Sequence, residues 1–267
     1  MIYGLEKDRN VVGIHHFSTI PLKGSDKAIT YLQYTGSADD KFMQDNYGKA
    51  FGYRGHGIMT LLYAAMAKQA EENAKNTLDR PGGHAGTILE SEFIGQASDE
   101  DAIRYTKERL VTHGRTGAKT IMLRMKDGKL ISPHLQPALS SDAKAIKLLL
   151  SYRPAKYDAG KLDQVEQMDF DEGKRVVNAF IDNFDTEGFN KDEVEKARQQ
   201  VAEWFANTAS VELWPPAQLP TVVELAKQDP FLMSQCEDDF GDMDAHAALV
   251  SEAFGQKTDA AASVLGS

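Results

Sequence analysis

Apolar side chains at helical spacing mark the clearest stretch of the chain, residues 170–205. In each half of it they recur every three or four positions, so one face of a helix must be buried. Between the halves, Asn190 is a typical cap residue and Glu193 follows three positions later, as in a capping box. We therefore predict two amphipathic helices joined by a short polar loop. Their buried positions are Val176, Val177, Phe180, Ile181 and Phe184, then Val194, Ala197, Val201, Trp204 and Phe205.

The N-terminal part has a different pattern. Residues 10–20 and 28–34 are rich in β-branched and aromatic side chains, which predicts two strands joined by a turn. Helical spacing from Ile58 predicts a helix that runs to about Asn76, and a further strand is expected at residues 86–94. A mixed α/β arrangement follows for this part.

Residues 126–128, which include the Asp-Gly pair 127–128, separate apolar runs at 119–125 and 129–132, and this is a strong signal for an antiparallel hairpin. Upstream, Ser98 and the acidic residues after it predict the start of a helix that reaches about Val111.

The remaining pattern is helical. We predict helices near Ser141, carrying Ile146, Leu149 and Leu150, at Thr221, by a capping box with Glu224, and at 244–254. After residue 153, strand signals vanish and acidity rises. The expected fold class is therefore α+β: a mixed α/β part with an antiparallel hairpin at 1–153, then an all-helical acidic part at 154–254. The small, polar residues 255–267 predict a flexible tail.

The charge distribution is uneven. The net charge is −10, yet residues 104–153 carry 11 basic and 3 acidic side chains, whereas residues 154–267 carry 9 and 23. Such asymmetry is typical of a face that binds a polyanion opposite an acidic surface. Pairing of the basic segment with the acidic one within the fold explains it equally well, and both interpretations stay open here.

Composition excludes several classes of protein. No apolar run approaches the roughly 20 residues that cross a bilayer, and the first residues lack the order of a signal peptide. The single cysteine, Cys236, excludes an internal disulfide, and no zinc-ligand spacing is present. We expect a cytoplasmic protein with no membrane contact, no metal and no cofactor.

Two motifs fail on spacing. The acidic loop 182–193 lacks either the central glycine or the final carboxylate of an EF-hand, whichever residue is taken as the first. The glycine-rich stretches at 52–57 and 81–86 match no phosphate-binding loop. Calcium and nucleotides are therefore not expected as ligands.

Scattered histidines leave one enzymatic alternative open. His15, His56, His84 and His134 are separated in the sequence, but residues of a site need only be close in space. His56, His84, His113 and His134, each next to glycine or proline, are expected in solvated turns. The acidic neighbours of Cys236 are expected to raise the pKa of its thiol, which makes a nucleophile improbable.

The basic segment supplies the main candidate site. Its hairpin can present cations to phosphates, through charge rather than through base recognition. The alternative is a solvated surface hairpin whose lysines protect strand edges from aggregation. The candidate nucleic-acid-binding residues are Arg115, Lys119, Arg124, Lys126 and Lys129.

In pattern, the chain resembles the bacterial nucleoid-associated protein family of the NdpA type. The resemblance rests on the helix at 176–184, a short acidic loop, the segment NKDEVEKARQQVAEWF, the later LPTVVELAK and, more loosely, a long helix followed by PGGH. It covers about half of the chain. The resemblance implies a cytoplasmic, nucleoid-located protein that binds DNA without catalysis as a homo-oligomer.

The leading hypothesis is therefore a non-enzymatic, nucleic-acid-associated protein that binds DNA through the basic hairpin. The alternative is a phage or mobile-element interaction or assembly protein whose acidic helical part binds a protein partner. An enzyme with a composite histidine site comes third.

Overall fold

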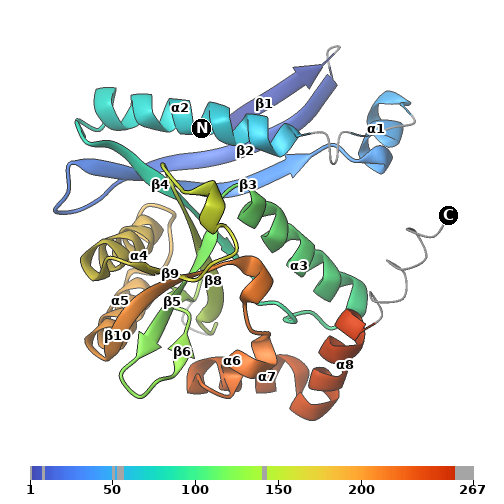
Figure 1. Cartoon of the computed structure of the whole chain (residues 1–267), viewed down its shortest axis with the longest axis vertical. Coiled ribbons are helices and arrows are strands. Elements are labelled where there is room, and N and C mark those ends of the chain that lie inside the picture. Colours follow the sequence, from blue (N-terminus) through green and yellow to red (C-terminus); the bar gives the residue numbers. More distant parts are fainter. Residues whose placement is uncertain (1, 8–9, 50–51, 53–56, 140–142, 256–267) are drawn as a thin grey trace. The chain divides into compact units, whose positions relative to one another are not determined.

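A computed structural model describes residues 2–7, 10–49, 52, 57–139 and 143–255 of the chain (Figure 1). It shows an α+β fold, as the sequence predicts. Tertiary contacts divide the chain into two compact units that interleave along the sequence. Unit 1 comprises Met1–Leu89 and Tyr152–Tyr157, and unit 2 comprises Glu90–Ser151 and Asp158–Ser267.

The sheet of unit 1 is built from three antiparallel strands and one parallel strand. The strands β1, β2 and β3 pair with antiparallel neighbours, whereas β3 and β4 run parallel because the chain crosses over through a helix. The predicted strands at 10–20 and 28–34 are thereby confirmed. The elements are β1 (Ile2–Lys7), β2 (Asn10–Pro21), β3 (Lys27–Ser37), α1 (Asp40–Tyr47), α2 (Ile58–Asn76) and β4 (Gly83–Ser91, of which the last two residues belong to unit 2).

Helix α2 packs on β2 and β3, and its length matches the prediction from the sequence. Gly13 of β2 permits this packing, since a Cβ there would lie 2.5 Å from the Ile58 side chain. The buried face of α2 consists of Leu62, Tyr63, Met66, Ala70 and Ala74.

The sheet of unit 2 has the strand order β8, β5, β10, β9, with β6 paired to β5 and β7 to β8. The predicted hairpin is confirmed: Leu123 pairs with Ile131 and Arg124 with Leu130, while Gly128 in the turn has a left-handed φ of 88°. The strands are β5 (Lys119–Met125), β6 (Leu130–Ile131), β7 (His134–Gln136), β8 (Ile146–Pro154, of which the last three residues belong to unit 1), β9 (Glu166–Met168) and β10 (Thr208–Trp214).

The helices of unit 2 include the predicted amphipathic pair. Asn190 caps the second of these helices by accepting hydrogen bonds from two backbone N–H groups, and Thr221 forms the predicted capping box with Glu224. Asp99, not Ser98, caps the first helix of the unit. The helices are α3 (Glu100–Arg115), α4 (Phe170–Phe184), α5 (Lys191–Ala206), α6 (Val222–Ala226), α7 (Pro230–Phe240), α8 (Met243–Gly255) and two 3₁₀ turns at Ala159–Lys161 and Pro216–Gln218.

Two predictions from the sequence are wrong. The helix expected near residue 141 is strand β8 from Ile146 onward, and Ser141 itself lies outside the described residues. A short apolar run that ends at a proline fits a buried strand as well as a helix. The part after residue 153 is not all-helical, since β9 and β10 lie in it. In β10, Val211 and Leu213 are buried in the alternation of a strand, which the longer helical patterns around it obscure.

The apolar core that positions the candidate site lies in unit 2, where α3 and α6 to α8 gather beside β5 and β8. Its members include Ile103, Met122, Leu149, Leu232 and Val250. Within the described ranges no helix has both the length and the apolar character to span a membrane. Of the predicted tail at 255–267, Gly255 is the last residue of the final helix, and residues 256–267 fall outside the described residues.

Candidate nucleic-acid interface

The five candidate basic residues form two groups at opposite ends of β5. Lys119 begins this strand and Met125 ends it, so the two ends are about 20 Å apart at roughly 3.3 Å per residue. The exposed Arg115 precedes Lys119 by four positions, at the end of α3. Arg124, Lys126 and Lys129 belong to the other end, where the chain turns into β6. We call residues 124–129 the hairpin tip.

Lys119 is buried, with 4% of its surface exposed. Its Nζ donates to the carbonyl oxygens of Lys161 and Gln164 at 2.7 Å and forms an ion pair with Glu166. An ammonium group has three donors, and these three contacts use all of them. The structure therefore places Lys119 in an internal contact rather than on a phosphate-binding face.

Arg124 ties the hairpin to β10. Its Nε and Nη2 donate to the two carboxylate oxygens of Glu212 at 3.1 and 3.0 Å, and its Nη1 donates to the Gly128 carbonyl at 3.1 Å. Burial alone would raise the pKa of Glu212, but hydrogen bonds from Arg124 and Trp214 outweigh it and hold the pKa below its ordinary value. The charge of Arg124 is thus neutralised by Glu212, and its hydrogen bond to the Gly128 carbonyl stabilises the turn.

Lys126 and Lys129 are the exposed cations of the hairpin tip. The Nζ of Lys126 donates to the backbone carbonyl of Ala206 at 2.9 Å. Lys129 pairs with Asp127 at 2.9 Å, where both side chains are more than half exposed. Its hydrogen bond lowers the pKa of Asp127. Because such surface pairs contribute about 0–1 kcal/mol, a phosphate can displace the carboxylate.

The backbone of the hairpin tip is anchored on both strands. The N–H of Lys126 donates to the Asn207 carbonyl at 2.9 Å, and that of Leu130 donates to the Gln228 side chain at 3.0 Å. The exposed Lys227 is the chain neighbour of Gln228, which makes the second contact. No sequence pattern could have found Lys227, because 98 positions separate Leu130 from Gln228.

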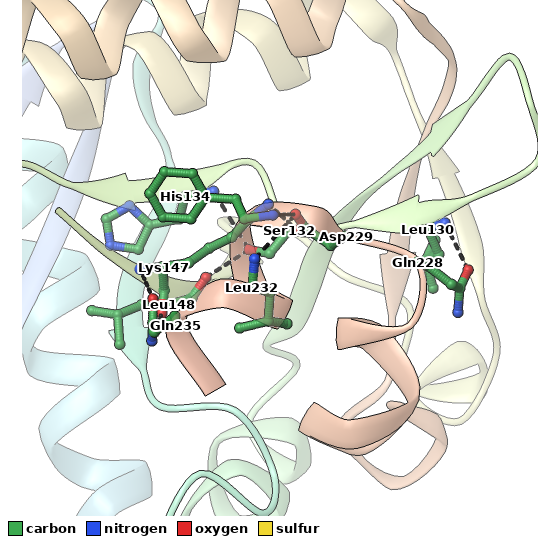
Figure 2. A network of polar contacts seen from close by, with 10 residues as sticks. Leu130, Ser132, His134, Lys147, Leu148, Gln228, Asp229, Leu232 and Gln235 are labelled. Atoms are coloured by element: carbon green, nitrogen blue, oxygen red, sulfur yellow. Dashed lines mark hydrogen bonds and ion pairs between the residues drawn. The ribbon is translucent and has the colours of Figure 1, made fainter. Parts of the chain in front are cut away.

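Beside the hairpin, a buried polar network joins β7, β8 and α7. Figure 2 shows Lys147 of β8 meeting Asp229, the cap residue of α7, while Gln235 of α7 bonds the backbone of Lys147. The Lys147 side chain is fully buried and its Nζ lies 4.0 Å from the centre of the Trp204 ring. Burial lowers the pKa of Lys147, and the charge of Asp229 opposes that shift. The other oxygen of Asp229 accepts from the N–H groups of Phe231 and Leu232, so both carboxylate oxygens have partners.

Ser132 and His134 belong to the same network but do not form a nucleophile and base pair. The Ser132 hydroxyl donates to the Leu148 carbonyl at 2.7 Å and accepts from the backbone N–H of His134. The His134 ring instead bonds Glu90 through Nε2 at 2.9 Å and packs against Phe180. These contacts hold strands and helices together, and they leave the serine without a base.

The other histidines of the open enzymatic alternative lie elsewhere. His15 is buried on β2 and His84 on β4, both in unit 1, whereas His134 belongs to unit 2. His56 falls outside the described residues. The expectation that His84, His113 and His134 lie in solvated turns is wrong, since His84 and His134 are buried in strands and His113 is buried on α3. Burial, more than any charge, lowers the pKa of His84 to about 4.

Cys236 is buried on α7. Burial first, and then the charge of Asp239, raises the pKa of its thiol to about 12, which confirms the predicted direction. Among the residues that the structure describes, no three His, Cys, Asp or Glu side chains are grouped so that they could hold a metal ion.

Comparisons of the chain with protein-family models, with curated protein sequences and with solved structures find no match.

Proposed function

We propose that the protein associates with DNA, without catalysis, by placing Lys126 and Lys129 of the hairpin tip against backbone phosphates. One observation carries this proposal: two exposed ammonium groups stand on a turn whose backbone is anchored on both sides. A two-stranded ribbon is narrow enough to approach a groove of the duplex. The function agrees with the one implied by the resemblance to nucleoid-associated proteins, which also implies a place at the nucleoid and self-association.

The structure changes which residues carry the proposal. Lys119 and Arg124 are used internally, so we assign phosphate contact to Lys126 and Lys129 and add Lys227 beside them. Contacts of this kind fix position on a duplex and carry no sequence information. The binding we propose is therefore independent of DNA sequence and strongly dependent on salt.

The test measures the affinity for a 20-base-pair duplex by fluorescence anisotropy at several salt concentrations. Replacing Lys126 and Lys129 by alanine should reduce the slope of log K against log salt by about 2, since each lost phosphate contact removes about 0.9. At low salt the same variant should bind roughly tenfold more weakly, a loss of about 0.7 kcal/mol per contact.

A matched control alters the same net charge elsewhere. Lys174 of α4 and Lys191 of α5 are exposed lysines of unit 2, and replacing both by alanine should leave the slope unchanged. If the wild-type protein does not bind the duplex even at low salt, or if both double variants behave alike, the hairpin tip is not the interface. That result would favour the alternative hypothesis, an interaction or assembly protein that binds a protein partner.

A further inference from the structure

A short segment of unit 1 combines basic and aromatic side chains outside the hairpin tip. It runs from Arg153, near the end of β8, to Tyr157, and Lys156 lies between them. Lys156 and Tyr157 are exposed, the tyrosine to 41%. The hairpin tip does not use this segment, and it belongs to unit 1 alone.

The segment is held firmly to β4. The N–H of Ala155 donates to the Ala85 carbonyl at 2.9 Å, and the Tyr152 hydroxyl donates to the same oxygen at 3.0 Å. A Cβ on Gly86 would lie 2.6 Å from the Arg153 carbonyl, so glycine permits the close approach of the two strands. The backbone that carries Tyr157 is therefore fixed from one side before any ligand arrives.

Arg153 contacts two tyrosine rings. Its guanidinium carbon lies 5.3 Å from the centre of the buried Tyr63 ring and 5.0 Å from that of the exposed Tyr157 ring. A cation at this distance is attracted to an aromatic face. The contact limits the freedom of Tyr157, so a ligand that stacks on the ring loses less entropy than it would on a free side chain.

From this arrangement we infer that Tyr157 stacks a base of single-stranded nucleic acid, while Lys156 contacts the neighbouring phosphate. An exposed aromatic ring beside an arginine and a lysine is the arrangement on which unpaired bases stack, whereas a duplex hides its base faces. The inference rests on the proposed association with nucleic acid, but it names a different segment and a different form of the ligand.

The experiment compares the binding of a 20-nucleotide oligothymidine with that of the 20-base-pair duplex. Replacing Tyr157 by alanine should weaken oligothymidine binding roughly tenfold and change duplex binding less than twofold. Tyr157→Phe keeps the ring and should bind like the wild type. Since the side chain is exposed, both variants should keep the circular dichroism spectrum and the melting temperature of the wild type.

An abasic strand of the same length isolates stacking from charge. The wild type should bind the abasic strand about as weakly as Tyr157→Ala binds oligothymidine. The affinity of Tyr157→Ala for the abasic strand should be only slightly lower than its affinity for oligothymidine. Equal losses on single strand and duplex would overturn the inference, as would unchanged oligothymidine binding by Tyr157→Ala or no oligothymidine binding by the wild type.

The two proposals fail in different ways. Loss of the difference between the hairpin variant and its lysine control rejects the hairpin tip and leaves the Tyr157 inference standing. Unchanged oligothymidine binding by Tyr157→Ala rejects the stacking inference and leaves the hairpin tip standing.

Discussion

Two parts of unit 2 place lysines of the same basic segment in opposite surroundings. At the hairpin tip, Lys126 and Lys129 extend into solvent and their contacts are a backbone carbonyl and an exposed carboxylate. In the buried network, Lys147 has no exposed surface and contacts Asp229 and the face of Trp204. At the hairpin tip a lysine can exchange its present contact for a ligand. In the buried network, removing the charge of Lys147 would leave Asp229 buried without its ion-pair partner.

The contrast shows why the charge of a segment is a poor measure of a binding face. The segment 104–153 carries a net charge of +8, but Lys119 and Lys147 are internal and Arg124 is neutralised by Glu212. Pairing between the basic segment and the acidic one, which the sequence left as an alternative, thus accounts for these three side chains. Lys126 and Lys129 of the hairpin tip, by contrast, stay exposed.

The largest expected effect tests the buried side of the contrast. Asp229→Ala leaves the Lys147 ammonium uncompensated in the interior and also removes the cap of α7, so we expect the free energy of unfolding to fall by about 3–5 kcal/mol. Denaturant unfolding followed by circular dichroism measures it. The double variant Lys147→Met, Asp229→Asn removes both charges and should recover most of the loss. A loss below about 1 kcal/mol in the single variant would show that the pair is not buried in solution.

A smaller effect concerns a buried imidazole of the same segment. Burial first, and then the charge of Arg109, lowers the pKa of His113 to about 4, whereas an unfolded histidine has a pKa of about 6.5. Between these values the unfolded state binds more protons, so stability falls as pH decreases. From pH 7 to pH 5 we expect His113 to lower the free energy of unfolding by about 2 kcal/mol.

The measurement compares His113→Leu with the wild type at these two pH values. The variant should lose about 2 kcal/mol less than the wild type when the pH falls, whatever its stability at pH 7. Identical pH dependence in the two proteins would mean that His113 is accessible to protons in the folded state.

The smallest expected effect on stability concerns the exposed lysines of the hairpin tip. Replacing both Lys126 and Lys129 by alanine should change the free energy of unfolding by less than about 0.5 kcal/mol, because exposed contacts contribute little. Denaturant unfolding of this double variant measures the change. A loss above about 1.5 kcal/mol would show that these lysines stabilise the fold, and any loss of DNA binding could then no longer be assigned to phosphate contacts.

How far the sequence predicts the fold depends on the range of the interactions. The helix pair, its Asn190 cap and the turn at Gly128 follow from neighbours within a few positions, and all three are confirmed. Strands β8 and β10 were missed because a short apolar run takes its conformation from the strands beside it. For the candidate site, the sequence predicted the hairpin but could not separate its exposed cations from its internal ones.

The sequence by itself determined the helix starts, the hairpin turn and the excess of positive charge in the middle of the chain. Each of these depends on local propensity, on capping or on composition. Only the tertiary structure decided that Lys147 meets Asp229, 82 positions away, and that Arg153 lies between Tyr63 and Tyr157. The physical reason is that burial and ion pairing depend on which side chains the fold brings together. The separation of two residues along the chain does not determine their distance in space.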